Sequence, residues 1–511
     1  MKPLVHQSQE QRSDQMADRL RDRSFTLDSD LQLSVRNQPL LCQRLLRHVP
    51  SKRLVFRGEY RNTPVIIKLF VHKKRAKVHW QRELDGAQRL LDKKILTPAI
   101  IFAGRTDEGI EVLIFEYIQG ESLAQFWNTS SYADKLEKLK ACMQVLTQHH
   151  KAALAHQDLH YANFYLAQSG EVYTLDGEEV KSFSRPLNIN ARLKNLAVFL
   201  AQSFDIKPAD YPLLLDCYAQ LNALGLNDQE TFFLKLIKHH QNWRIKHYLK
   251  KIFRDCTDVV TGKNVTGKSV TQKSTDSENR SYGFLLRREY DSPQIRALLQ
   301  NPEHYFNADT SVFLKQGNTC TVKRVNLGNE ELVIKRYNPK GAAYELSHKG
   351  RMSRARKSWK NAHLLQFMGI ATPAPVAVVE HNNTLGKRRS YFITCYQPGE
   401  DSWTYFCSER HNEQTKHCVA QSILNILDKL AQYRITHGDL KGSNFIIHQE
   451  QVYLIDLDAM KQHPWQRGFK QQQQKDHKRF LKNWDKKACY QHWKEFFNLS
   501  WLSRQISNQR S

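Results

Sequence analysis

The sequence predicts an α+β protein that contains two tandem copies of one domain, and three observations lead to this prediction. The stretch HQDLHYANFYL (156–166) recurs in the second half as HGDLKGSNFII (437–447). The segments around both copies follow the same order, which indicates duplication more strongly than either motif alone. Residues 255–281 separate the halves, and their Thr, Ser, Lys, Asn and Asp residues cannot build a core.

The first half alternates between strand and helix patterns. Short apolar runs predict strands at VIIKLF (65–70), VLIFEYIQGESL (112–123) and VYTLD (172–176). The spacing of apolar residues favours helices at QRELDGAQRLL (81–91) and KLKACMQVLTQHHKAALA (138–155).

The second half repeats this order. Strands are predicted at LVIKRY (332–337), YFITCYQPGE (391–400) and VYLID (452–456). Helices are predicted at KSWKNAHLLQFMG (357–369) and VAQSILNILDKLAQYRI (419–435).

The length and the hydrophobic content fit more than one core. A chain of 511 residues is too long for one ordinary domain, and 40% hydrophobic residues argue against general disorder. We predict four segments: an N-terminal extension without an assigned role (1–45), a first domain (46–254), a polar linker (255–282) and a second domain with a basic tail (283–511).

The chain is strongly basic, with a formal net charge of +26. This charge indicates a polyanionic surface or substrate, such as nucleic acid, anionic lipid or a phosphorylated glycan.

The nine cysteines include no C-x-x-C pair, which favours reduced thiols in a cytosolic protein over a disulfide frame or a zinc site. The first residues lack the apolar region of a signal peptide, and no run reaches the ~18 apolar residues that span a bilayer. We therefore expect a protein that is soluble or attached only to a membrane surface.

The motif of the second half has the residue types that phosphoryl transfer requires, namely a lysine for the phosphates, an acid near the attacking hydroxyl and ligands for Mg²⁺. In HGDLKGSN, Asp439 would accept the hydroxyl proton and Asn444 would bind the metal. Asp456 ends the next strand and would chelate Mg²⁺, while Lys335 would hold the nucleotide phosphates from its own strand. An aspartate after a strand is commonly only a turn residue, but the ordered repetition of the whole set favours a site.

The first half places the same roles on Asp158, Asn163, Asp176 and Lys68, and Glu83 is well spaced to orient Lys68 from the following helix. The halves differ at two of these positions. When they are aligned on the pairs Thr97-Pro98 and Thr372-Pro373, the second half has Ser358 in place of the glutamate. Conversely, the second half has Lys441 in its loop, where a cation neutralises charge on the transferring phosphoryl group, and the first half has His160 there.

These residues resemble the protein-kinase-like fold and, within it, the lipopolysaccharide core kinases that phosphorylate heptose or 3-deoxy-octulosonic acid (Kdo). The similarity includes Phe164 and Phe445 directly after the loop asparagines, GIATPAP (369–375), and Leu457 after Asp456. The resemblance implies two bilobal domains, each with a small β-rich N-lobe and a larger helical C-lobe. It also implies ATP and Mg²⁺ as cofactors and a sugar hydroxyl as the acceptor.

Two departures leave alternatives open. Neither half has G-x-G-x-x-G before its lysine strand; the nearest segments are FRGEY (56–60) and KQGNTCTV (315–322). The segment after Asp456 is short and lacks A-P-E, which counts against the first alternative, a Ser/Thr/Tyr protein kinase. The second alternative is a non-catalytic kinase-like scaffold or nucleic-acid-binding protein. The intact lysine, asparagine and aspartate positions count against it, so nucleic acid is not the expected partner.

Basic clusters occupy equivalent places after the two lysine strands, at HKKRAKVHWQR (72–82) and SHKGRMSRARKSWK (347–360), and a third lies in the tail at 461–487. They favour an anion-facing surface, because anionic lipid headgroups attract Lys and Arg side chains. We expect a lipopolysaccharide core glycolipid as the partner and a cytoplasmic protein that is peripheral on the cytoplasmic face of the inner membrane. The sequence leaves open which sugar is modified, whether both domains work, and the oligomeric state.

Overall fold

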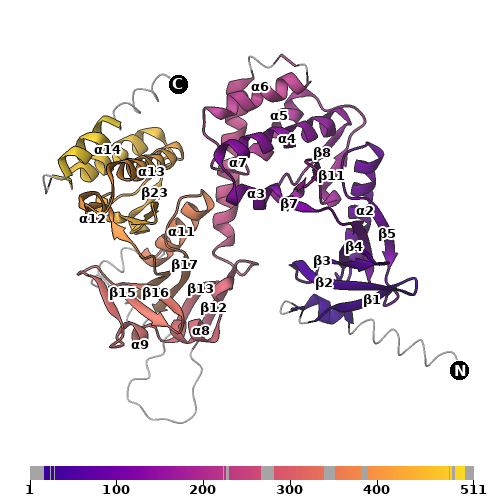
Figure 1. The fold of residues 1–511 in the computed structure, drawn as a ribbon. Coiled ribbons are helices and arrows are strands. Elements are labelled where there is room, and N and C mark those ends of the chain that lie inside the picture. The colour runs from indigo at the N-terminus through magenta and orange to yellow at the C-terminus, as the bar shows by residue number, and fades with distance from the viewer. Residues whose placement is uncertain are drawn as a thin grey trace, which may run out of the picture. The chain divides into compact units, whose positions relative to one another are not determined.

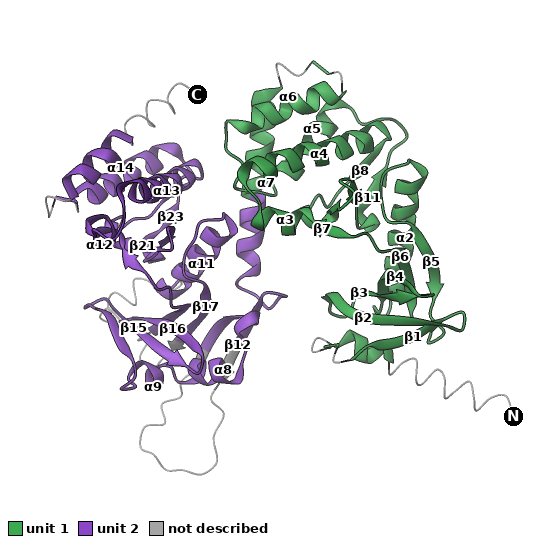
Figure 2. Cartoon of the chain, viewed as in Figure 1, with its two compact units in different colours: residues 1–242 green, residues 243–511 purple. Residues whose placement is uncertain are grey.

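The computed structural model describes residues 16–22, 25–27, 29–222, 224–225, 229–265, 281–338, 352–382, 388–482, 484–485 and 490–500. The chain divides into two compact units, residues 1–242 and 243–511 (Figure 2). We refer to them as the first and second domains.

The N-lobe of the first domain is a six-stranded antiparallel sheet with the order β1-β2-β3-β4-β6-β5 (Figure 1). Its strands are β1 (Leu31–Val35), β2 (Gln38–Val49), β3 (Arg53–Tyr60), β4 (Thr63–Phe70), β5 (Ile100–Arg105) and β6 (Glu111–Glu116). One face packs its alternating apolar side chains, such as Leu54 and Ile67, into a core. The helix α2 (Ala76–Asp92) covers the other face, where Ala87 packs with Phe70 and Leu113.

The C-lobe of the first domain is mainly helical. Its helices are α3 (Leu123–Thr129), α4 (Tyr132–Lys151), α5 (Ile189–Leu200), α6 (Asp210–Asn222) and α7 (Glu230–Lys251), the last of which continues into the second domain. Short strands carry the loops between them: β7 (Gly120–Ser122), β8 (Leu154–His156), β9 (Phe164–Ala167), β10 (Val172–Thr174) and β11 (Val180–Ser182). Phe164, which follows the loop asparagine, is fully buried against Phe199 of α5 and so holds the loop onto the helical core.

The N-lobe of the second domain is a seven-stranded antiparallel sheet with the order β12-β13-β17-β18-β16-β15-β14. Its strands are β12 (Val259–Val265), β13 (Ser281–Arg287), β14 (Val312–Gln316), β15 (Cys320–Leu327), β16 (Glu330–Tyr337), β17 (Pro375–Asn382) and β18 (Arg388–Cys395). The helices α8 (Pro293–Gln300) and α9 (Pro302–Phe306) pack against one apolar face of this sheet through Leu298 and Phe306. The helix α11 (Arg354–Phe367) is equivalent in chain order to α2.

The C-lobe of the second domain repeats the helical arrangement. Its helices are α12 (Ser402–Cys407), α13 (Glu413–Gln432) and α14 (Gln466–Lys482), and residues 490–500 are also helical. Its short strands are β19 (Glu400–Asp401), β20 (Ile435–Thr436), β21 (Phe445–His448), β22 (Gln451–Leu454) and β23 (Lys461–Gln462). An aromatic cluster joins the loop to this core, because Phe445 lies 6.0 Å from Phe480 and Phe480 lies 5.2 Å from Phe497, measured between ring centroids. The predicted α+β class and tandem bilobal architecture are thus confirmed.

The structure differs from the sequence prediction at the domain edges. Residues 31–49, most of which we assigned to an extension, form β1 and β2, and Leu33, Val35 and Leu40 are buried in the first sheet. Residues 259–265, assigned to the linker, form the edge strand β12 of the second sheet, where Val259 is fully buried. All three strands owe their order to pairing with a neighbour, which composition alone does not reveal. Residues 266–280 lie outside the described residues.

Two further findings concern the cysteines and the helices. Cys407 is disulfide-bonded, so the prediction that all cysteines are reduced is wrong at this position. Seven other cysteines are free thiols. Among the helices that the structure describes, none combines the length and apolar character needed to cross a membrane.

Candidate active site

The catalytic loop of the second domain runs from β20 to β21 and is fixed by buried hydrogen bonds. The His437 ring is buried, and its Nε2 donates to the Ile455 carbonyl at 3.0 Å. Asp476, which reaches in from α14, accepts hydrogen bonds from the backbone N–H groups of His437 (2.8 Å) and Gly438 (3.0 Å). Asn444 Nδ2 donates to the Asp439 carbonyl at 2.8 Å. The loop therefore holds Asp439 and Asn444 in a fixed relative position.

The Asp439 carboxylate faces two cations. Lys441 Nζ lies 3.3 Å from its Oδ2, and Arg479 Nη1 from α14 lies 2.8 Å from its Oδ1. About a third of the Asp439 side chain is exposed, so solvent and an acceptor can reach it. Sequence reasoning identified Lys441 but missed Arg479, because the packing of α14 against the loop has no motif.

Lys335 and Asp456 meet as predicted by the order of the motifs. Lys335 lies on β16 and pairs with Asp456, which adopts a left-handed conformation (φ 64°) after β22. Burial disfavours the ionised carboxyl of Asp456, but Lys335 outweighs this effect and lowers its pKa. Burial likewise opposes the Lys335 ammonium, but Tyr337, Asp456 and Asp458 raise its pKa, so both groups are charged.

For a carboxylate partner of Lys335 the sequence offered only Glu345, ten residues further on, which lies outside the described residues. Asp458 takes this place in the structure. Its Oδ1 lies 3.1 Å from Lys335 Nζ, and its Oδ2 accepts from Arg354 Nε at 2.7 Å. Ser358, at the position of Glu83, is instead hydrogen-bonded to the Tyr337 hydroxyl at 2.7 Å. An acidic residue lies two positions after Asp176 and after Asp456, as Glu178 and Asp458. This repetition is the sequence signal that could have identified Asp458.

A cavity of about 460 Å³ lies between the two lobes of the second domain. Its apolar side chains come from both lobes and include Val322, Val333, Ile446 and Ile455. Its polar groups converge from four elements of the sequence: Lys315, Lys335, Lys441, Asn444 and Asp456. An apolar slot that opens onto cations, an amide and a carboxylate fits a purine base followed by phosphates and Mg²⁺.

The first domain builds its catalytic loop in the same way. His156 Nε2 donates to the Leu175 carbonyl at 3.1 Å, and Asn163 Nδ2 donates to the Asp158 carbonyl at 2.8 Å. Asp158 is exposed, and Asp176 has the same left-handed conformation as Asp456 (φ 63°). The exposed His160 occupies the position of Lys441, and its Nδ1 accepts from the Ala162 N–H at 3.1 Å.

The ion pairs above the first loop differ from those of the second. Lys68 pairs with Glu83 of α2, as the sequence predicted from their spacing. A buried arginine, Arg53 at the start of β3, adds a second cation, and its Nη2 lies 2.9 Å from Asp176 Oδ2. Burial opposes ionisation of Asp176, but Lys68 and Arg53 outweigh it and lower the pKa of this carboxyl. No sequence signal identified Arg53.

The two domains therefore differ in their fit to Mg²⁺ and ATP. In the second domain, the oxygens of Asp456 and Asn444 border an accessible cavity and suit a hard divalent cation. In the first domain, Glu83, Asp176 and Glu178 lie close enough to share a cation, but the Arg53 guanidinium already contacts all three carboxylates. This donor set does not fit a metal-bound triphosphate.

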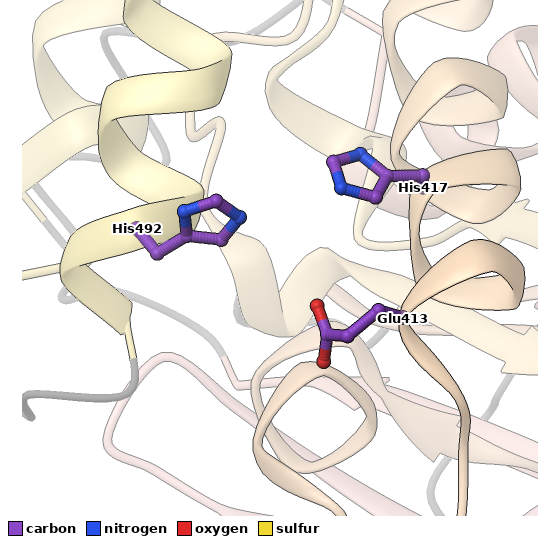
Figure 3. Close-up of side chains that lie close together, drawn as sticks. All are labelled: Glu413, His417 and His492. Atoms are coloured by element: carbon purple, nitrogen blue, oxygen red, sulfur yellow. The ribbon is translucent and has the colours of Figure 1, made fainter.

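A third cluster lies away from the loops, on the C-lobe of the second domain. Glu413 and His417 of α13 face His492 of the 490–500 helix (Figure 3). One ligand atom from each lies within 4.8 Å of the others.

Comparisons with solved structures list kinases of low similarity. A crystal structure of WbdD is 14% identical, with a TM-score of 0.32, over 41% of this chain and 53% of that chain. The PknI kinase domain of Mycobacterium tuberculosis is 14% identical, with a TM-score of 0.28, over 42% of this chain and 100% of that chain. No curated protein matches the chain.

A family model matches the chain twice, at residues 52–218 and 315–499. Each region contains a lysine strand, an H-x-D-L-x-x-x-N loop and an aspartate at the end of the strand that follows, and together they cover most of the sequence. The chain therefore belongs to the lipopolysaccharide kinase (Kdo/WaaP) family and contains the family's kinase-like domain in tandem duplication.

Proposed function

We propose that the protein is an ATP-dependent phosphotransferase whose second domain transfers the γ-phosphoryl group to a hydroxyl of a lipopolysaccharide inner-core sugar, heptose or Kdo. One observation carries this proposal: Lys335, Lys441, Asn444 and Asp456 converge on one cavity with an apolar slot. Family membership supports the phosphotransfer chemistry and the class of acceptor.

Residues that line this cavity would bind the nucleotide, and Asp439, two residues before Lys441 of the lining, would take part in proton transfer. When bound, ATP supplies the phosphoryl group, and Mg²⁺ neutralises charge on the phosphates. Asp456 and Asn444 would hold the metal, and Lys335 would hold the phosphates. Asp439 would accept the proton of the attacking sugar hydroxyl, and Lys441 would offset negative charge beside it. Lys441 and Arg479 each contact the Asp439 carboxylate and so fix its position beside the acceptor.

The segment after Asp456 supports a sugar acceptor over a peptide. Only residues 460–465 separate the turn at Leu457–Ala459 from α14, and β23 ties this segment to β20. In the first domain β11 is tied to β8 in the same way. Protein kinases use a long activation segment here to seat a peptide. The short segment and the partial exposure of Asp439 together suit a bulky glycolipid acceptor better than a peptide.

Phosphoryl transfer from labelled ATP to truncated core lipopolysaccharide tests the proposal directly. The Asp439→Asn variant should lose on the order of 10²-fold in kcat, because it lacks the proton acceptor. Asp158→Asn, the matched variant in the first domain, should keep the rate of the unmodified protein. Label on a peptide but not on the core oligosaccharide would favour a protein kinase instead. Absence of any label transfer, with binding of the glycolipid retained, would favour a non-catalytic scaffold.

A further inference from the structure

A single buried arginine distinguishes the phosphate region of the first domain. Arg53 is only 6% exposed, and its guanidinium lies between carboxylates of both lobes. Its Nη2 is 2.9 Å from Asp176, and its Nη1 is 3.4 Å from Glu178 and 3.6 Å from Glu83. A side chain in this position occupies the space between the N-lobe sheet and the metal aspartate.

The surrounding carboxylates are all paired. Lys68 contacts Glu83, and Lys52 Nζ lies 3.1 Å from Glu178, which also accepts from His79 Nδ1 at 2.8 Å. Arg53 itself completes the pairing of Asp176. Removing one member of such a buried network leaves an uncompensated charge, which is strongly unfavourable. Each carboxylate of the network thus faces a cation of the protein itself, although Glu83 Oε2 and Arg53 Nε are buried without a hydrogen-bond partner.

The second domain has no arginine at the equivalent position. In the first sheet Val55 pairs with Lys68, and in the second sheet Val322 pairs with Lys335. Two residues before each valine, the first domain has Arg53 and the second has Cys320. Cys320 is a small free thiol, so Lys335 and Asp456 remain open to the cavity.

We infer that the first domain does not bind Mg²⁺-ATP and that Arg53 holds its two lobes together as a fixed, non-catalytic module. The inference rests on the proposed function only for the identity of the nucleotide. The guanidinium replaces the divalent cation as the partner of Asp176. All nucleotide binding by the chain then belongs to the second domain.

Calorimetric titration of the full-length protein with a non-hydrolysable ATP analogue and Mg²⁺ tests this inference. The expected result is one site per chain, which Lys335→Met removes and Lys68→Met leaves unchanged. Two sites, or a site lost with Lys68→Met, would overturn it. The count does not depend on which acceptor is used, so a wrong acceptor leaves this result standing.

A reciprocal exchange tests the arginine itself. Cys320→Arg should weaken nucleotide binding by the second domain at least tenfold, whereas Cys320→Ala should not change it. Hydrogen exchange across the second domain verifies that both variants are folded. An arginine at residue 320 that leaves the affinity of a folded protein intact would show that this side chain does not exclude the nucleotide.

A separate observation concerns the cluster of Glu413, His417 and His492. Glu413 and His417 are one helical turn apart, so both project from the same face of α13. His492 approaches from the 490–500 helix, and Figure 3 shows that the three side chains point toward a common space. The cluster lies outside the proposed catalytic cavity.

The surroundings of the cluster fix one of its imidazoles. The His417 ring lies 4.9 Å from the Trp493 ring and 5.3 Å from the Phe496 ring, measured between centroids. Glu413 Oε1 also accepts from Lys416 Nζ at 3.0 Å, and a carboxylate has acceptor sites enough to bind an ion as well. The packed His417 ring is a fixed ligand, and the exposed Glu413 and His492 side chains can rotate to bind an ion beside it.

We propose that this cluster binds Zn²⁺. Two imidazoles and one carboxylate are ligands that zinc prefers, whereas Mg²⁺ and Ca²⁺ prefer oxygen ligands alone. Ligand atoms around tetrahedral zinc are about 3.3 Å apart, so small rotations of Glu413 and His492 close the site. The ion would join α13, which leads through β20 into the catalytic loop, to the helix at 490–500.

Zinc titration of tag-free protein stripped with a chelator tests the site. The unmodified protein should bind one Zn²⁺ per chain, and its Tm should rise by roughly 5 °C at saturation. His417→Ala and His492→Ala should each weaken binding at least tenfold, while His448→Ala, on β21, should not. Co²⁺ substitution should give the visible absorption of a tetrahedral site. Unchanged binding by the His417→Ala/His492→Ala double variant, or no saturable binding by the unmodified protein, would overturn the proposal.

Discussion

At the scale of single residues, the catalytic loop of the second domain depends on a buried carboxylate that lies outside the H-x-D-L-x-x-x-N motif. In the second domain the Asp476 carboxylate is 5% exposed and accepts from two consecutive backbone N–H groups of the loop. Burial raises its pKa, whereas the hydrogen bonds from Gly438 and His437 oppose this rise. Asp476 is therefore a positioning residue for Asp439.

Replacement of Asp476 by asparagine should reduce kcat by about 10²-fold, because a misplaced base loses its alignment with the acceptor. The asparagine keeps the size of the side chain but turns one acceptor into a donor that faces the loop N–H groups. The KM for ATP should stay unchanged, since Lys335 and Asp456 are untouched. Steady-state kinetics separate the two parameters, and an equal loss in ATP affinity would indicate general unfolding instead.

Arg53 controls the stability of the first domain in a pH-dependent way. Because the pKa of Asp176 is lowered from its ordinary value of 3.8, the ion pair stabilises the fold fully above that pH. The stabilisation is lost as the pH falls from 3.8 toward the lowered value.

The Arg53→Met variant should thus be less stable at pH 7, by about 3–5 kcal/mol, since it leaves buried carboxylates unpaired. Its deficit relative to the unmodified protein should shrink on acidification below about pH 4. Hydrogen exchange of first-domain amides in increasing urea, at pH 7 and below about pH 4, measures the deficit in unfolding free energy and its dependence on pH. A deficit that is independent of pH would contradict the assigned ion pair.

At the scale of elements, the domains differ in how the N-lobe helix contacts the turn that follows Asp176 or Asp456. The helix is α2 in the first domain and α11 in the second. In the first domain two glycines meet: a Cβ at Gly86 of α2 would lie 1.8 Å from the Gly177 carbonyl oxygen. In the second domain Asn361 of α11 donates to the carbonyls of Leu457 (2.7 Å) and Met460 (3.2 Å). One contact is steric and the other is a hydrogen bond, but both hold the helix against the turn.

Gly86→Ala should force α2 away from this turn and destabilise the first domain by more than about 2 kcal/mol, as overpacking does. Hydrogen exchange in α2 should become faster, while exchange in α11 should not change. Arg82→Ala, at an exposed position of the same helix, serves as the control, because it introduces alanine without a close contact. Equal effects of the two substitutions would show that the close approach is unimportant.

The sequence predicted the features that depend on local pattern. The strands with Lys68 and Lys335 and the two catalytic loops were identifiable because each is a short motif between apolar runs. Arg53, Asp458, Asp476 and Arg479 were not identified, because their roles depend on strand register and on helix packing across the C-lobe. The strands β1, β2 and β12 were missed since each is ordered by its neighbour in the sheet.

At the scale of the whole molecule, the net charge of +26 is the property most relevant to the acceptor. In the first domain Lys73, Lys74, Arg75 and Lys77 are exposed at the start of α2. In the equivalent cluster of the second half (347–360), residues 347–351 lie outside the described residues. Charge of this kind raises the local concentration of an anionic glycolipid and is weakened by salt.

The KM for intact core lipopolysaccharide should therefore rise several-fold between about 50 and about 300 mM salt, because ions screen charges beyond the Debye length. The KM for a small neutral sugar acceptor should change little over the same range. Initial rates at fixed ATP give both values. Parallel changes for the two acceptors would mean that the basic surface does not attract the glycolipid.

The contrast between Arg53 and Cys320 has a consequence for the genetics of such proteins. Some arginine and cysteine codons differ by a single base, so one point mutation in a duplicated gene can add or remove the guanidinium that we infer to exclude the nucleotide. A relative that encodes cysteine at the position of Arg53 is therefore the protein in which to count nucleotide sites by titration.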